Sequence, residues 1–269
     1  MTNPSGFQVS GSAPENYQRF NAAIMAPFIE ALVSTAEIRE GDRVLDIACG
    51  TGFATRRAAA VVGASGRVTA LDLNPGMIAM ARSIEAPDGA PIEWHEGSAL
   101  DLPFDAGTFS AVICQQGIQF FPDLGRAASE MARMAAPGGR IAVSFWAALD
   151  QQTYMRAQAE HLRAALGDAV APLAPAFALS PDTVRAAFTA AGLREVIATL
   201  VTPTISLPSL DPYAAQQVST LPVAPAFNAL SDDQRRAYVE GMVQDLAAYR
   251  TAQGSYDCPI ASWVVTARK

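Results

Sequence analysis

The sequence predicts an α/β fold, in which helices cover both faces of a doubly wound, mostly parallel sheet. Short apolar runs alternate with segments of helical periodicity, which is the pattern of βαβ units. A glycine turn follows the first apolar run, in VLDIACGTG at 44–52, and such a turn between a strand and a helix is typical of a ligand site. The chain has 269 residues, half of them apolar and 17% charged, which favours one main domain with insertions.

Helices are expected before the first strand. Apolar residues recur at helical spacing from about 14 to 36, and Ser12 followed by Glu15 has the pattern of a capping box. We therefore expect residues 1–40 to form an N-terminal helical cap and residues 41–269 to form the main domain.

Seven apolar runs are predicted to be strands. They lie at 44–48, 67–73, 92–96, 110–115, 140–146, 195–202 and 262–269. Helices are expected between the first five, at 53–62, 75–84 and 124–135. Pro137, Gly138 and Gly139 are expected to turn the chain into the fifth strand.

Two segments interrupt this rhythm in the C-terminal half, at about 148–179 and 207–255. A helix is expected to begin after Ser180, and Ser231 with Gln234 forms a second capping box pattern. We call the two interruptions the lid segments, because we expect them to cover the carboxyl edge of the sheet. That edge is where open α/β sheets bind ligands.

The composition disfavours several classes of protein. The net charge of −7 and the lack of a Lys/Arg run argue against binding to nucleic acid or to an anionic membrane surface. No signal peptide and no apolar stretch of roughly 18 to 20 residues is evident, so we expect a cytoplasmic protein without membrane insertion. Cys49, Cys114 and Cys258 form no CxxC pair and there are only two histidines, so no disulfide or metal site is expected.

The glycine turn has two chemical interpretations. A dinucleotide fingerprint needs a small residue where Thr55 stands, and Asp46 would repel a pyrophosphate by several kcal/mol at an effective dielectric of about 20. A cationic ligand such as S-adenosylmethionine fits better, because Asp46 attracts it while Gly50 and Gly52 let the backbone approach closely. Asp72 follows Gly52 by 20 residues, where a βαβ unit places a ribose-binding carboxylate.

Four motifs in this order resemble the class I methyltransferases, within the type 11/25 branch that includes the ubiquinone and menaquinone C-methyltransferases. The resemblance covers about Gly41 to Trp146, through VLDIACGTG, ALDLNPGMI, GSALDLPFDAGTFSAVICQQGIQFFPD and MAAPGGRIAVSFW. It implies a Rossmann-like, seven-stranded sheet and transfer of a methyl group from S-adenosylmethionine, with S-adenosylhomocysteine as product. The acceptor is expected to be a small apolar or aromatic molecule.

The resemblance also implies which residues contact the cofactor. They comprise a group around the methionine part, a ribose acid, an adenine group and a contact from the N-terminal helix. In that order they are Asp46, Ala48, Gly50, Gly52 and Gln115; Asp72; Leu73, Met77, Ser98 and Ala99; and Tyr17. Ala48 and Ser98 depart from the family pattern, where glycine and aspartate are frequent, and Ser110 replaces a frequent acid and is given no catalytic role.

The sequence identifies no general base. Alignment of two reactants in a closed site can by itself supply roughly 7 to 11 kcal/mol. His161, Tyr154 and Gln119 are candidates for a catalytic role only because of their position in the lid or at its mouth. Two alternatives stay open: a protein that binds S-adenosylmethionine, or a pericyclic catalyst, without methyl transfer, and a nicotinamide oxidoreductase, which Asp46 and Thr55 disfavour. The sequence leaves the acceptor and the oligomeric state open, a homodimer included.

Overall fold

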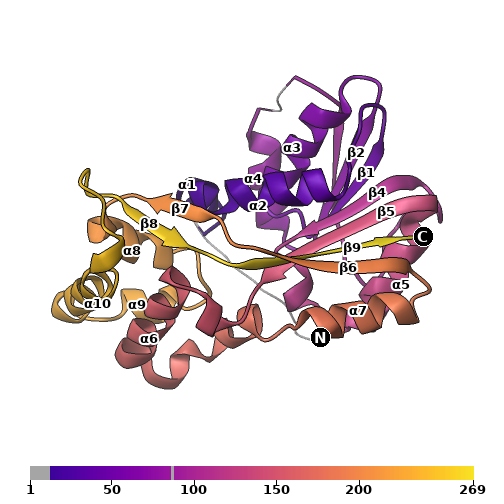
Figure 1. Ribbon diagram of the computed structural model, residues 1–269. Coiled ribbons are helices and arrows are strands. Elements are labelled where there is room, and N and C mark those ends of the chain that lie inside the picture. The colour runs from indigo at the N-terminus through magenta and orange to yellow at the C-terminus, as the bar shows by residue number, and fades with distance from the viewer. Residues whose placement is uncertain (1–12, 86–87) are drawn as a thin grey trace.

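The computed structural model describes residues 13–85 and 88–269. Seven strands form one sheet in the order β3-β2-β1-β4-β5-β9-β6 (Figure 1). Neighbouring strands from β3 to β5 are parallel, and β9 runs antiparallel between β5 and β6. The strands are β1 Arg43–Ile47, β2 Arg67–Asp72, β3 Ile92–Glu96, β4 Phe109–Gln115, β5 Ala135–Trp146, β6 Arg194–Val201 and β9 Ser262–Arg268. The predicted fold class is confirmed.

Helices cover both faces of this sheet because its strands are apolar on both sides. On β1, Val44 packs in one hydrophobic cluster and its neighbour Leu45 in the other, since successive side chains of a strand alternate. The first cluster includes residues of α2 and α3, and the second includes residues of α5 and α7. These helices are α2 Ala22–Thr35, α3 Phe53–Val62, α5 Leu124–Met134 and α7 Pro181–Ala190.

The predicted helices and strands of the N-terminal half occur close to their expected bounds. Two helices precede β1, α1 Ala13–Phe20 and α2, while Ser12 of the first capping box pattern lies outside the described residues. Helix α4 spans Pro75–Ser83, and the side chain of its N-cap Asn74 accepts hydrogen bonds from the backbone N–H groups of the first turn. Asn74 thereby performs the capping that Asp72 could otherwise have been assigned.

The turn expected at Pro137–Gly139 lies instead within β5, which begins already at Ala135. Its pairing with β4 shifts register between Phe109 and Ala111, and Gly138 has φ +73°. Between these pairs β5 advances five residues while β4 advances two, so the glycines lie in an irregularity within a longer strand.

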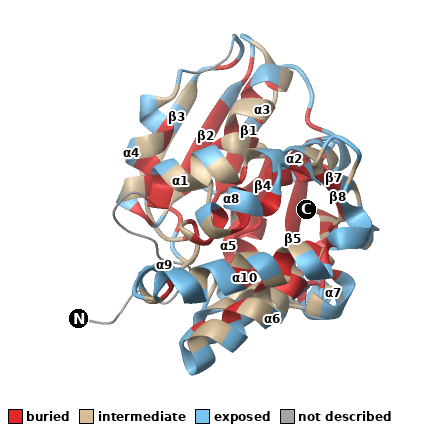
Figure 2. Cartoon of the chain, turned by 90° about the vertical axis from the view of Figure 1, so that its left-hand side faces the viewer, coloured by how far each residue is buried: buried red, intermediate tan, exposed pale blue. Residues whose placement is uncertain are grey.

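The two lid segments are mainly helical and lie together at one end of the sheet (Figure 1). The first holds η2 Leu149–Gln151, α6 Tyr154–Leu166 and η3 Gly167–Phe177, and the second holds α8 Leu210–Val218, α9 Ala224–Asn228, α10 Asp232–Asp245 and η4 Ala247–Tyr249. Figure 2 looks from the lid side, with α8 and α10 in front of β4 and β5. The capping box of Ser231 and Gln234 is confirmed at the start of α10.

A small antiparallel sheet of two strands, β7 Thr204–Leu207 and β8 Tyr256–Pro259, flanks the second lid segment. It was not predicted from the sequence, because Pro203 and Pro208 flank β7 and suggest a proline-rich loop. The signal was the alternation within TISL, in which Ile205 and Leu207 are buried and their neighbours are exposed.

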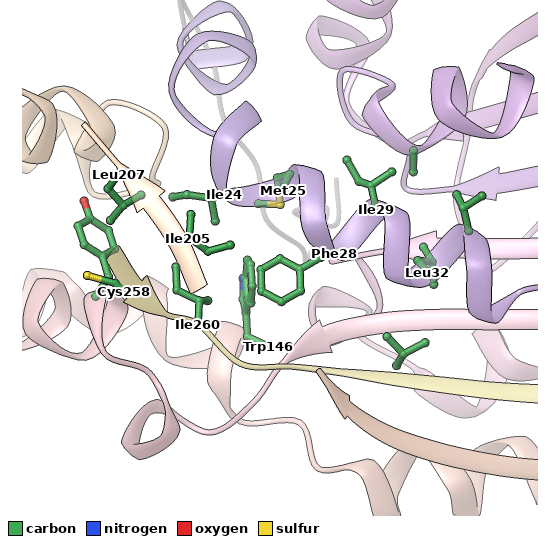
Figure 3. Packing of buried hydrophobic residues seen from close by; sticks show 14 of the residues in the cluster. Ile24, Met25, Phe28, Ile29, Leu32, Trp146, Ile205, Leu207, Cys258 and Ile260 are labelled. Carbon is green, nitrogen blue, oxygen red and sulfur yellow. The ribbon is translucent and has the colours of Figure 1, made fainter. Parts of the chain in front are cut away.

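Helix α2 packs between the seven-stranded sheet and the small sheet of β7 and β8 (Figure 3). Phe28 of α2 contacts Trp146 at the end of β5 edge to face, with ring centroids 5.2 Å apart. Both side chains are buried in one cluster with Ile205 of β7 and with Ile260, which follows β8. Helix α2 is therefore part of the core that joins the lid to the sheet. Burial of each side chain of this size contributes about 1.5 to 3 kcal/mol to stability.

Candidate active site

A cavity of about 510 Å³ lies at the carboxyl edge of the sheet, beneath the lid. Its volume falls in the range typical of small-molecule sites, about 300 to 1,000 Å³. The walls come from the ends of β1, β2, β4 and β5, from α1 and α2, and from the lid elements α6, η3 and α8. Nine of the eleven predicted cofactor residues line it, namely Tyr17, Ala48, Gly50, Asp72, Leu73, Met77, Ser98, Ala99 and Gln115. Their contact with a cofactor stays a prediction.

The turn after β1 brings its two glycines to different surroundings. Gly50 has φ +55° and lines the cavity, and a Cβ built on it would have no neighbour within 4 Å. Gly52 has φ +85° and does not line the cavity; a Cβ there would lie 2.4 Å from Cη2 of Trp94. Gly50 thus leaves room for a ligand, whereas Gly52 lets the start of α3 pack against Trp94 of β3. Ala48 also has a positive φ, +56°, so alanine takes the left-handed conformation that glycine adopts without strain.

Asp72 joins the glycine turn to the end of β2. Its Oδ2 accepts a hydrogen bond of 2.7 Å from the Gly50 N–H, and its Oδ1 accepts one of 2.8 Å from the Asn74 N–H. An ionised carboxylate offers about four lone-pair sites, so about two are left for hydroxyl donors of a ligand. Burial raises the pKa of Asp72, and the two backbone donors oppose that rise. The acid therefore fits the vicinal diol of a ribose.

Tyr17 of α1 lies over this part of the cavity. Its ring centroid is 6.2 Å from that of Phe53, which also lines the cavity. Burial raises the pKa of Tyr17, and the charge of Asp72 raises it further, so the phenol stays protonated. The N-terminal helix thus places a neutral aromatic side chain beside the predicted ribose acid.

Asp46 lies behind the turn rather than in the cavity wall. Its side chain is fully buried, its Oδ2 accepts a 2.5 Å hydrogen bond from Oγ1 of Thr55, and its Oδ1 has no partner among the described residues. Thr55 is the third residue of α3, so the acid secures the start of that helix. Burial raises the pKa of Asp46 to about 7; the Thr55 hydroxyl opposes this rise and the charge of Asp72 adds to it. Asp46 does not line the cavity, and its contact with a ligand, expected from the sequence, stays a prediction.

The loop 98–104, which carries the predicted adenine contacts, is held by side chains of α5. Glu130 is buried and accepts a 2.9 Å hydrogen bond from the Leu102 N–H. Arg133 pairs with Glu130 at 2.6 Å and donates to two carbonyls of the loop, while Arg126 donates to a third. These three residues were not predicted from the sequence; the available signal was an acid, Glu130, on the apolar side of the predicted helix.

Tyr154 lines the cavity, as its position in the lid suggested. It is fully buried, and burial raises its pKa well above 10. At neutral pH its phenol therefore stays protonated and can donate or accept a hydrogen bond, but it cannot act as a base.

Gln119 does not line the cavity, although it was expected to face the acceptor. Its Nε2 donates to Oε1 of Gln116 at 3.2 Å, and Gln116 in turn donates to Ser262 at 2.8 Å. Gln116 lines the cavity in its place. The residue that follows β4 takes the left-handed conformation, with φ +54° at Gln116, and this local turn could not be read from QQGIQFF.

His161 also lies away from the cavity. Its Nε2 is 2.8 Å from Oδ2 of Asp245, and a Cβ on Gly241 would lie only 2.3 Å from the imidazole Cε1. The imidazole therefore joins α6 to α10, and Gly241 provides the room for it.

Comparison with known proteins concerns the part of the chain that contains the glycine turn and Asp72. Residues 44–139 match the family model described as a methyltransferase domain. Over these residues the chain is similar to the class I methyltransferases. This family implies the use of S-adenosylmethionine.

Two relatives and a solved structure are similar to this chain. The chain is 40% identical over 131 residues to an uncharacterized protein of Mycobacterium tuberculosis H37Rv, which is 49% of this chain and 47% of that protein. It is 40% identical over 112 residues to a 2-phytyl-1,4-naphtoquinone methyltransferase of Thermosynechococcus vestitus, 41% and 49% of the two chains. The chain thus spans about half the length of the curated relatives it matches. Its fold is similar to that of the YcgJ protein of Bacillus subtilis, with a TM-score of 0.58, 18% identity and coverage of 91% and 98%.

The walls of the cavity carry little charge. Among the described residues that line it, Asp72 is the one acidic residue, and lysine, arginine and histidine are lacking. Cys49 also lines the cavity, but burial raises the pKa of its thiol well above the usual range. The described ranges contain no group of three or more His, Cys, Asp or Glu side chains placed to hold a metal ion.

No single helix among residues 13–85 and 88–269 has both the length and the apolarity of a membrane span. One bent pair, Tyr154–Phe177 with Pro181–Ala190, passes that test only when its two parts are taken together.

Proposed function

We propose that this protein is an S-adenosylmethionine-dependent methyltransferase that acts on a small, predominantly apolar acceptor. The observation that carries the proposal is Asp72, a half-buried acid that lines the cavity and has about two hydrogen-bonding sites left after binding the glycine turn. A nicotinamide dinucleotide is disfavoured, because its pyrophosphate would find no cation among the described cavity-lining residues.

The residues of this chain would bind, orient and enclose the reactants. S-adenosylmethionine supplies the methyl group when bound, on a positively charged sulfur. Asp72 would hold the ribose hydroxyls, Gly50 would leave space for the methionine part, and Tyr17 would cover it. No cavity-lining side chain in the described ranges is placed as a general base, so the proposed rate enhancement comes from alignment and exclusion of water, worth roughly 7 to 11 kcal/mol.

The relatives suggest which acceptors to test first. One of them is named for a phytyl-naphthoquinone substrate, and the apolar lid residues that line this cavity, such as Leu173 and Phe177, suit a hydrophobic ring. A panel of reduced quinones and substituted phenols is therefore the first choice.

Two measurements test the proposed function. Calorimetry with S-adenosylmethionine, S-adenosylhomocysteine and NAD should show binding of the first two and none of the third; the reverse result would contradict the proposal. Mass spectrometry should then detect acceptor-dependent formation of S-adenosylhomocysteine. Tight cofactor binding without product across the panel would favour the alternative of a cofactor-binding protein or pericyclic catalyst.

A further inference from the structure

The lid contributes a distinct part of the cavity, which we call the acceptor chamber. Its apolar lining comes mainly from α6, η3 and the end of α8, and includes Met155, Leu173, Ala176, Phe177 and Leu221. Its polar lining consists of Gln158, Gln217 and Thr220 from the lid and Asn21, the N-cap of α2. None of these side chains carries a formal charge, so the chamber offers hydrogen bonds without a counter-ion.

The polar lining forms one hydrogen-bonded network. Nε2 of Gln158 lies 2.6 Å from Oε1 of Gln217, 3.4 Å from Oη of Tyr238 and 3.5 Å from Oη of Tyr154. Gln217 in turn donates from its Nε2 to Oδ1 of Asn21 at 3.1 Å. Among these contacts, the one with Oε1 of Gln217 sets the orientation of the Gln158 carboxamide, because that oxygen can only accept, whereas the two tyrosine hydroxyls can donate or accept.

The opposite atom of that carboxamide lacks a partner. Gln158 is only 6% exposed and lines the cavity, yet its Oε1 accepts no hydrogen bond from any residue in the ranges 13–85 and 88–269. This oxygen is not one of the fully buried side-chain atoms that lack a partner, so it is open to the cavity and a hydrogen-bond donor there can reach it. The carboxamide oxygen is therefore an acceptor that is oriented in advance by the network behind it.

We infer that the acceptor chamber binds an uncharged, largely apolar molecule that carries a hydroxyl or N–H group. This group donates a hydrogen bond to Oε1 of Gln158. This inference rests on the proposed function, because it assigns the rest of the cavity to the cofactor. A carboxylate or phosphate in the same place would lose its hydration without gaining a cation, and it would face the carbonyl oxygen of Gln158. Anionic acceptors are therefore excluded from the chamber.

Three ligands with the same ring system test this inference: 2-naphthol, 2-methoxynaphthalene and 2-naphthoate. The full chain is first saturated with S-adenosylhomocysteine, and binding of each ligand is then measured by calorimetry. We expect 2-naphthol to bind about tenfold more tightly than its methyl ether, the effect of one buried hydrogen bond. We expect 2-naphthoate to bind more weakly than both.

Two variants locate the effect at one atom. Gln158→Met removes the carboxamide but keeps a side chain of similar length. In this variant 2-naphthol and its methyl ether should bind with about equal affinity. Tyr238→Phe is the matched control: it removes one contact behind Gln158 Nε2, Tyr238 does not line the cavity, and the preference should persist. The affinity of each variant for S-adenosylhomocysteine shows whether it is folded.

The outcomes separate this inference from the proposed function. Equal affinity for 2-naphthol and its ether, tighter binding of 2-naphthoate, or no ligand binding by a protein that binds S-adenosylhomocysteine would each overturn the acceptor chamber inference alone. A preference for 2-naphthol that survives Gln158→Met would do the same. Failure of the protein to bind S-adenosylhomocysteine would instead count against the proposed function.

Discussion

The two parts of the cavity are built in different ways. Around Asp72 the walls are strand ends and a glycine turn, so backbone N–H groups supply most of the described hydrogen bonds. In the acceptor chamber the polar atoms belong to side chains of α2, α6 and α8, which are distant in sequence. The family match covers residues 44–139 and hence the first part only. Backbone geometry thus preserves a recognisable motif, whereas side chains on lid helices can specify a different acceptor on the same sheet.

The largest expected effect separates two glycines of the same turn. Gly52→Ala should lower the free energy of unfolding by about 3 kcal/mol or more, because its Cβ would lie 2.4 Å from Trp94 at a positive φ. Gly50→Ala, whose Cβ meets open space, should lose only about 1 to 2 kcal/mol of stability through its positive φ, and should weaken S-adenosylmethionine binding instead. Denaturant unfolding and calorimetry measure the two effects. Equal losses of stability would show that neither glycine is specific to the ligand.

The second expected effect concerns the ribose acid. Asp72→Ala should weaken S-adenosylmethionine binding about 100-fold, because it removes the proposed hydrogen bonds to a charged group and frees the Gly50 N–H that shapes the turn. The control in the other part of the cavity is Gln158→Met, which should leave cofactor affinity within about twofold. Calorimetry on both variants checks the division, and a similar loss in the two would contradict it.

The same two parts of the cavity differ in how well their residues could be predicted from the sequence. Asp72 and Gly50 lie in short motifs whose spacing is imposed by the sheet, so their places at the strand ends could be predicted. The placement of His161 against Gly241, and of Gln116 instead of Gln119 in the cavity wall, depends on how lid helices and a left-handed residue pack in three dimensions. The same holds for Asp46, whose partner Thr55 becomes apparent only when α3 is in place.

A smaller effect is expected from the side chains that hold the adenine loop. Glu130→Gln should weaken cofactor binding about tenfold, because the loss of the charge-assisted pair with Arg133 loosens the Leu102 N–H contact. Glu160→Gln removes an exposed ion pair with Arg156 in the lid and should have no measurable effect. If the two variants have equal cofactor affinity, α5 does not position the loop for the cofactor.

The smallest expected effect is a pH dependence of the free energy of unfolding, caused by Asp46 behind the glycine turn. Because burial raises the pKa of Asp46 from 3.8 to about 7, the folded protein binds more protons than the unfolded chain between these values. The sign follows from linkage: stability falls as the pH rises through this window, and the loss is complete only above the folded pKa. Between pH 6 and pH 8 the wild-type protein without ligand should lose about 1 kcal/mol from this group. Asp46→Asn should abolish this contribution, so a difference between wild type and variant that is constant from pH 6 to pH 8 in urea unfolding would show that Asp46 does not titrate there.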